Sequence, residues 1–132
     1  MEKKIVIVIL TVYILQNPLA YMTVIKIEEQ QALEKLKRSG KEFIPLLAIN
    51  QLAVEIYKPA LVDNQQPHDR DEFYLVISGH GRFEMNGETT SFKAGDLLFV
   101  PAYADHRFID FSADFVTWVF FIGQDMKADA PR

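Results

Sequence analysis

The sequence contains no cysteine, which excludes a disulfide scaffold, a thiolate metal site and a cysteine nucleophile. It has no run of Lys and Arg, and its formal net charge is −4, so nucleic acid is not expected as a partner. It also lacks a Gly-rich phosphate loop and a serine in a nucleophile-elbow motif. The 132 residues are 49% hydrophobic and 12% aromatic, which excludes a disordered chain and predicts one domain with a sizeable core.

The first 21 residues contain a long apolar stretch from Ile5 to Leu15. As a helix this stretch would span about 16 Å, which is too short for a bilayer core of roughly 30 Å, so no stable membrane span is expected. Three interpretations of residues 1–21 stay open: a signal peptide, an extension upstream of a natural start at Met22, or an extra β-strand. The first predicts an exported protein and the second a cytoplasmic one. Residues 22–132 form the single predicted domain.

A short helix is predicted over residues 28–38. Acidic residues stand at its start and basic residues at its end, which matches the helix dipole, and Ser39-Gly40 ends it. The apolar stripe of this helix is narrow, as is typical of an accessory helix that packs on something larger.

The rest of the chain favours short β-strands separated by turns. Asn86-Gly87 is the strongest hairpin signal, because both residues tolerate positive φ. Residues 115–121 are apolar on both faces, so this strand is expected to be covered by the barrel core within and by a second sheet or a subunit without. The spacing predicts an all-β sandwich or small barrel with strands at 53–58, 72–78, 82–85, 88–92, 97–100, 106–111 and 114–121.

Two imidazoles and one carboxylate make a candidate metal site. His68 and Glu72 lie in one motif, and His106 lies in a second motif about 30 residues later. In a straight strand the Cα atoms of His68 and Glu72 would be about 13 Å apart, too far for two ligand bonds of about 2.1 Å to one ion. The hypothesis therefore requires a bend at Asp69-Arg70-Asp71, and His106 must come across the barrel from a later strand.

These two motifs resemble those of the cupin superfamily. In the first cupin motif a histidine precedes a glutamate, and six residues separate that glutamate from a glycine, as in His68, Glu72 and Gly79. In the second motif the spacing of glycine, proline and histidine fits Gly95, Pro101 and His106. The resemblance covers about residues 50–122. It implies an antiparallel jelly-roll barrel (a double-stranded β-helix) that is often a homodimer and commonly binds Fe, Mn, Zn or Ni inside the barrel.

By this resemblance the metal ligands are Gln66, His68, Glu72 and His106. Gln66 stands in place of the first histidine of the motif, and a glutamine carbonyl is a weaker ligand than imidazole. Three alternatives stay open: Gln66 binds through its oxygen, only the other three residues bind, or the site has lost its metal and kept its shape. Further departures are Ala60 and Tyr103 in place of glycines, and Asp110 in place of the final asparagine.

Other polar and aromatic residues have weaker claims to a role. Arg70 is a candidate clamp for a substrate carboxylate, although a turn residue in a surface ion pair is the simpler interpretation. Tyr103 stands three residues before His106 at the expected barrel mouth, so it is a candidate substrate contact. His80, in a Gly-His-Gly turn, is interpreted as a surface residue.

The expected function is metal-dependent chemistry of the oxygenase, isomerase or lyase type on a small polar organic molecule. The alternative is a cupin that binds or senses a small ligand or a metal without turnover. The departures at Gln66 and Tyr103 favour this alternative, whereas open coordination positions on the metal favour an enzyme.

Overall fold

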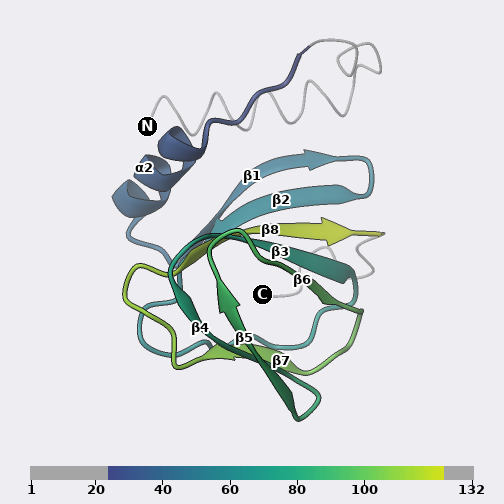
Figure 1. Ribbon diagram of the computed structural model, residues 1–132. Coiled ribbons are helices and arrows are strands. Elements are labelled where there is room, and N and C mark those ends of the chain that lie inside the picture. Colours follow the sequence, from purple (N-terminus) through teal and green to yellow (C-terminus); the bar gives the residue numbers. More distant parts are fainter. Residues whose placement is uncertain (1–23, 124–132) are drawn as a thin grey trace.

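The computed structural model describes residues 24–123, which form one helix and eight strands (Figure 1). The interpretations of residues 1–21, and with them the cytoplasmic or exported location, lie outside the described residues and stay predictions. Within residues 24–123, no helix has the length and apolar character needed to cross a membrane. The elements are α2 (Glu29–Ser39), β1 (Phe43–Ile49), β2 (Leu52–Tyr57), β3 (Asp71–Ser78), β4 (His80–Met85), β5 (Glu88–Lys93), β6 (Leu97–Val100), β7 (His106–Ile109) and β8 (Val116–Ile122).

The strands form two antiparallel sheets, as expected for a cupin jelly roll. The larger sheet has the order β1-β2-β8-β3-β6 and the smaller has the order β5-β4-β7. Figure 1 shows the smaller sheet facing one side of the larger one, with α2 on the other side. The predicted all-β fold with a short N-terminal helix is confirmed.

Local sequence signals account for most element boundaries. The β4–β5 hairpin turns at Asn86 and Gly87 with φ values of 49° and 84°, as the Asn-Gly pair predicts. Gly40 ends α2 in the left-handed conformation with φ of 66°. Strand β1 was not among the predicted strands. Pro45 interrupts its pattern, and the structure tolerates this proline because β1 is an edge strand whose pairing shifts register between Pro45 and Leu47.

Strand β8 lies in the middle of the larger sheet and is buried on both faces. Val119 and Phe121 belong to the core between the sheets. Val116 on the opposite face packs in a second cluster with Ala32 and Leu36 of α2. Helix α2 therefore covers the outer face at this end of β8. The prediction that a second sheet or a subunit would cover this face is wrong here. The prediction of an accessory helix is confirmed.

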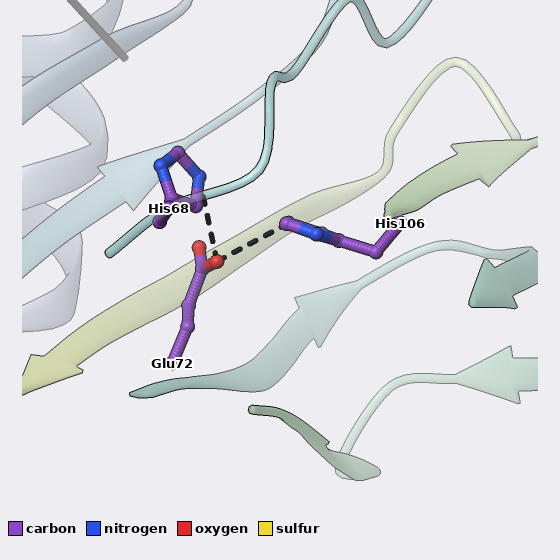
Figure 2. A group of neighbouring side chains, drawn as sticks. All are labelled: His68, Glu72 and His106. Atoms are coloured by element: carbon purple, nitrogen blue, oxygen red, sulfur yellow. Dashed lines mark ion pairs between the residues drawn. The ribbon is translucent and has the colours of Figure 1, made fainter. Parts of the chain in front are cut away.

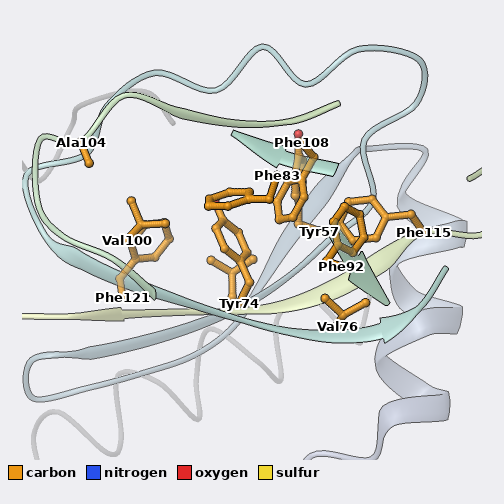
Figure 3. Close-up of a cluster of buried hydrophobic side chains, with 11 residues drawn as sticks. Tyr57, Tyr74, Val76, Phe83, Phe92, Val100, Ala104, Phe108, Phe115 and Phe121 are labelled. Carbon is orange, nitrogen blue, oxygen red and sulfur yellow. The ribbon is translucent and has the colours of Figure 1, made fainter. Parts of the chain in front are cut away.

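Aromatic rings fill much of the space between the sheets (Figure 3). Phe108 and Phe115 have ring centroids 4.6 Å apart, and Phe92 lies 4.8 Å from Phe115. In Figure 3, Phe92 and Phe115 lie at the opposite end of the core from Ala104 and Phe121. That second end contains the polar residues of the candidate site.

Gly79, the glycine of the first motif, is predicted to be essential for two reasons. Its φ is 87°, and the neighbouring backbone leaves no space for a side chain. A Cβ at this position would lie 2.5 Å from the Cα of Phe115, whereas a Cβ at Gly87, with φ of 84°, would meet nothing within 4 Å. Gly79→Ala should therefore lower the free energy of unfolding by about 1–3 kcal/mol more than Gly87→Ala, because both variants carry the φ penalty and only the first is overpacked. Urea unfolding measures both, and equal losses would contradict the packing argument.

Candidate metal centre

His68, Glu72 and His106 converge inside the barrel, as the sequence predicted (Figure 2). His68 precedes a bend at residues 69–70, after which β3 begins, so the bend that the hypothesis required is present. Nε2 of His68 lies 3.5 Å from Oε2 of Glu72, and Nε2 of His106 lies 3.2 Å from the same oxygen. Glu72 therefore lies between the two imidazoles.

The three side chains are shielded from solvent. Glu72 is 0% exposed, His106 is 3% exposed, and the side chain of His68 is 11% exposed. Each offers one ligand atom, and these atoms all lie within 4.8 Å of one another. With ligand bonds of about 2.1 Å, donor atoms around one ion are separated by roughly 3–4 Å. Small side-chain movements would therefore bring all three into one coordination sphere.

A backbone contact orients the ring of His106. Its Nδ1 lies 2.8 Å from the carbonyl oxygen of Ala104, which accepts a hydrogen bond from Nδ1–H. Donation from Nδ1 leaves Nε2, the nitrogen nearest Glu72, as the one that can bind a metal. The ring of His68 rests against Phe121 in an edge contact with centroids 5.1 Å apart.

Burial and a neighbouring carboxylate act on the pKa of His106 in opposite directions. Burial lowers it. The contact of Nε2 with Glu72 at 3.2 Å, the carbonyl of Ala104 and the negative charges of Glu72 and Asp63 together raise the pKa above its usual value. The raised pKa means that His106 keeps a proton more readily than a free imidazole, and metal binding at Nε2 would compete with that proton.

The loop before β7 connects the two histidines. The backbone N–H of Tyr103 donates to the carbonyl oxygen of His68 at 2.6 Å, and Ala104, the next residue, accepts from His106. A second bond runs from the N–H of Ala102 to Oδ1 of Asp71 at 2.9 Å. Both histidines are therefore held by one short segment, which fixes their separation.

Two departures from the second motif leave the backbone path intact. Tyr103 has φ of 68° and Asp110 has φ of 51°. Glycine and asparagine, the residues of the motif, are the ones that favour this left-handed region. At Tyr103 the loop therefore adopts a conformation that favours glycine, although the residue is not glycine. The side chain of Tyr103 is 70% exposed, so its predicted substrate contact stays a prediction.

The other residues considered from the sequence are Arg70, Gln66 and His80. The guanidinium carbon of Arg70 lies 4.7 Å above the centroid of Phe121, the ring that His68 also contacts. Gln66 is exposed, and its role as a ligand stays a prediction. His80 is exposed, in agreement with its interpretation as a surface residue.

Sequence reasoning missed two polar residues of the segment between β2 and β3. Asp63 is 5% exposed, and Gln65 donates to it from both its backbone and its side chain. These residues lie in a polar run, Asp63 to Gln66, that is typical of a surface loop. The sequence carries no local signal that the one carboxylate of this run, that of Asp63, is buried.

In the metal-free protein, Glu72→Gln should lower the pKa of His106. The substitution keeps the size of the side chain and removes the charge that raises the pKa, while burial, which lowers it, remains. Titration of the His106 ring protons by NMR measures the change, with exposed His80 as the internal reference. An unchanged His106 pKa would show that Glu72 is not the group that holds its proton.

Comparison with known proteins identifies the family. A family model described as "Cupin domain" matches residues 53–121. The chain is also 30% identical over 102 residues to an uncharacterised protein of Streptomyces coelicolor, a match that covers 76% of this chain and 95% of that protein.

Two solved structures extend the comparison. A structure described as that of DMSP lyases is 26% identical with a TM-score of 0.57, and the match covers 68% of this chain but only 50% of that chain. A putative mannose-6-phosphate isomerase from Ralstonia eutropha is 28% identical with a TM-score of 0.51, covering 62% of this chain and 83% of that chain. The sequence motifs, the two-sheet fold and a family match over more than half of its length agree, and the chain belongs to the cupin family.

Proposed function

We propose that this cupin domain holds one divalent metal ion between His68, Glu72 and His106 and uses it in chemistry on a small polar organic molecule. The observation that carries the proposal is the convergence of two imidazole nitrogens and a carboxylate oxygen within 4.8 Å, inside the barrel. A buried carboxylate is costly unless it is paired or coordinates a metal, and Glu72 is completely buried.

The donor set fits the metals that cupins commonly bind. Two histidines and one carboxylate suit Fe, Mn, Zn or Ni and leave coordination positions for water or substrate. When bound, the metal would act as a Lewis acid on an oxygen of the substrate. Of the chain's own groups, Glu72 would supply the negative charge, and the bond of Nδ1 to the Ala104 carbonyl would leave Nε2 of His106 free to bind the ion. Gln66 is retained as a candidate weak fourth ligand.

The reaction type is proposed at the level of class. The similar structures described as a lyase and an isomerase support lyase or isomerase chemistry, and the two-histidine, one-carboxylate set supports an oxygenase if the metal is iron. The alternative function, a cupin that binds or senses a ligand without turnover, is favoured by one observation. Gln66 stands in place of the first motif histidine and is exposed, so this site has two imidazoles where the motif has three.

Arg70 supports a substrate that carries a carboxylate. Its guanidinium lies over Phe121, which also contacts the candidate ligand His68, so a positive charge stands beside the site. Arginine binds a carboxylate through two parallel hydrogen bonds, which gives orientation as well as affinity. The positive charge of Arg70 would attract an anionic substrate.

A homodimer is proposed through the outer face of the larger sheet. Leu97, Phe99 and Ile122 on this face are 61%, 48% and 44% exposed, and Phe73 packs on Phe99 with centroids 4.9 Å apart. Contiguous exposed apolar side chains of this kind are typical of subunit interfaces. Light scattering after size-exclusion chromatography should give twice the 15.2 kDa chain mass, falling to one chain in Phe99→Lys. A monomeric wild type would contradict the dimer.

Metal content tests the ligand assignment. Untagged wild-type protein should contain close to one metal ion per chain by mass spectrometry, and His106→Ala should lose it because one of three ligands is gone. His80→Ala is the matched control, since this histidine is exposed and should leave the metal content unchanged. Absence of metal from the wild type, even after incubation with Fe, Mn, Ni and Zn, would overturn the metal site and favour a metal-free binder.

Small dicarboxylates test the role of Arg70. Binding of malonate to the metal-loaded protein, measured by calorimetry, should weaken about 10–100-fold in Arg70→Gln, because a charged hydrogen-bond pair is worth about 1.5–3 kcal/mol. Arg82→Gln is the control, since Arg82 is an exposed residue of β4 that pairs with Asp110. Equal affinity in wild type and Arg70→Gln would contradict the carboxylate clamp.

A further inference from the structure

A second polar layer, formed by Asp63, Gln65, Tyr57 and Tyr74, lies within the barrel. Asp63 is 5% exposed, and its carboxylate accepts four hydrogen bonds. Tyr57 OH and the N–H of Gln65 donate to Oδ1 at 2.8 and 3.1 Å. The side-chain amide of Gln65 and the N–H of Phe108 donate to Oδ2, each at 2.8 Å. Tyr74 OH completes the layer by donating to Oε1 of Gln65 at 2.9 Å.

This layer joins the strands that carry two of the candidate metal ligands. Phe108 follows His106 by two residues in β7, and Tyr74 follows Glu72 by two residues in β3. Residues i and i+2 of a strand share a face, so both pairs point into the barrel, in agreement with their burial. The bonds of Asp63 to β7 and of Gln65 to β3 therefore lie one side-chain row further along the same strands than the metal cluster.

The layer also joins the segment that carries the third ligand. Gln65 precedes His68 by three residues, and residues 58–70 have neither helix nor strand. Without a ladder of backbone hydrogen bonds, such a segment takes its position from side-chain and loop contacts. Asp63 and Gln65 supply such contacts inside the barrel. The bond from Tyr103 N–H to the His68 carbonyl supplies another, from the loop before β7.

We propose that the Asp63–Gln65–Tyr74 layer is a positioning device that sets His68 against Glu72 and His106, and thereby sets the affinity and coordination geometry of the metal. Asp63 links the loop to the strand of His106, and Gln65 links it to the strand of Glu72. The layer contains none of the three candidate metal ligands and acts through the ligands it places. This inference rests on the proposed metal site.

Cobalt binding to the full chain tests the inference. Asp63→Asn keeps the side-chain size but places an amide N–H₂ opposite groups that are themselves donors. Tyr74→Phe keeps the ring and removes the hydroxyl that donates to Gln65. In both variants Co²⁺ affinity should fall about 10–100-fold, the usual effect of removing a group that orients a ligand. The visible spectrum of bound Co²⁺ should also shift, which a mere loss of stability would not cause.

The control is Asp96→Asn. Asp96 likewise accepts a backbone N–H, that of Lys93, but it stands in the turn before β6, away from the cluster. It should leave both the affinity and the spectrum of Co²⁺ unchanged. Wild-type affinity and spectrum in folded Asp63→Asn and Tyr74→Phe would overturn the positioning role.

Hydrogen exchange separates this inference from the proposed function. If wild-type protein binds no Co²⁺, the metal site fails, and the positioning role is then decided in the metal-free protein. The backbone N–H groups of residues 63–66 and of His68 should exchange faster in Asp63→Asn than in wild type, whereas those of the β4–β5 hairpin should not change. Unchanged exchange over residues 63–68 would overturn the layer as a positioning device.

Discussion

The constraint on which the site depends is the complete burial of the Glu72 carboxylate. A charge in such a place is strongly unfavourable unless opposite charge or hydrogen-bond donors compensate it. Here the compensation comes from two imidazoles, 3.5 and 3.2 Å away, that arrive from a loop and from the other sheet. Glu72 itself is held rigidly, because β3 is paired on both sides, with β8 and β6. A fixed carboxylate with two orientable imidazoles around it is an arrangement in which a proton or a divalent metal can take the same place.

The two loops matter as much as the strands. His68 follows a segment without regular structure, yet its carbonyl is bonded to the loop that also orients His106, and Asp63 bonds its segment to β7. The geometry of the site thus depends partly on backbone groups of the second loop, which tolerate a change of side chain, and partly on the carboxylate of Asp63. This tolerance explains how Tyr103 can stand at a glycine position of the motif: the backbone keeps φ of 68°, and the ring lies mainly in solvent.

The parts of the fold and site that were predictable from sequence are those specified by local chemistry or by motif spacing. The Asn86-Gly87 hairpin, the end of the helix at Gly40 and the bend after His68 follow from residue conformational preferences and from ligand-bond lengths. Strand β1 and the outer cover of β8 were not predicted correctly, because an edge strand with a proline and a helix packed across a sheet depend on tertiary partners. The burial of Asp63 was also missed. Its donors come from positions 57, 65 and 108, and no local pattern brings them together.

A crystal structure of the metal-loaded protein, with anomalous scattering recorded at the metal edge, tests the central claim most directly. We expect one anomalous peak per chain inside the barrel, with Nε2 of His68, Nε2 of His106 and a carboxylate oxygen of Glu72 at about 2.0–2.2 Å from it. The same map would show whether Gln66 moves from its exposed position to join them. A peak bound elsewhere on the chain, or a barrel in which the histidines still face Glu72 with no peak between them, would contradict the claim that this cluster is a metal centre.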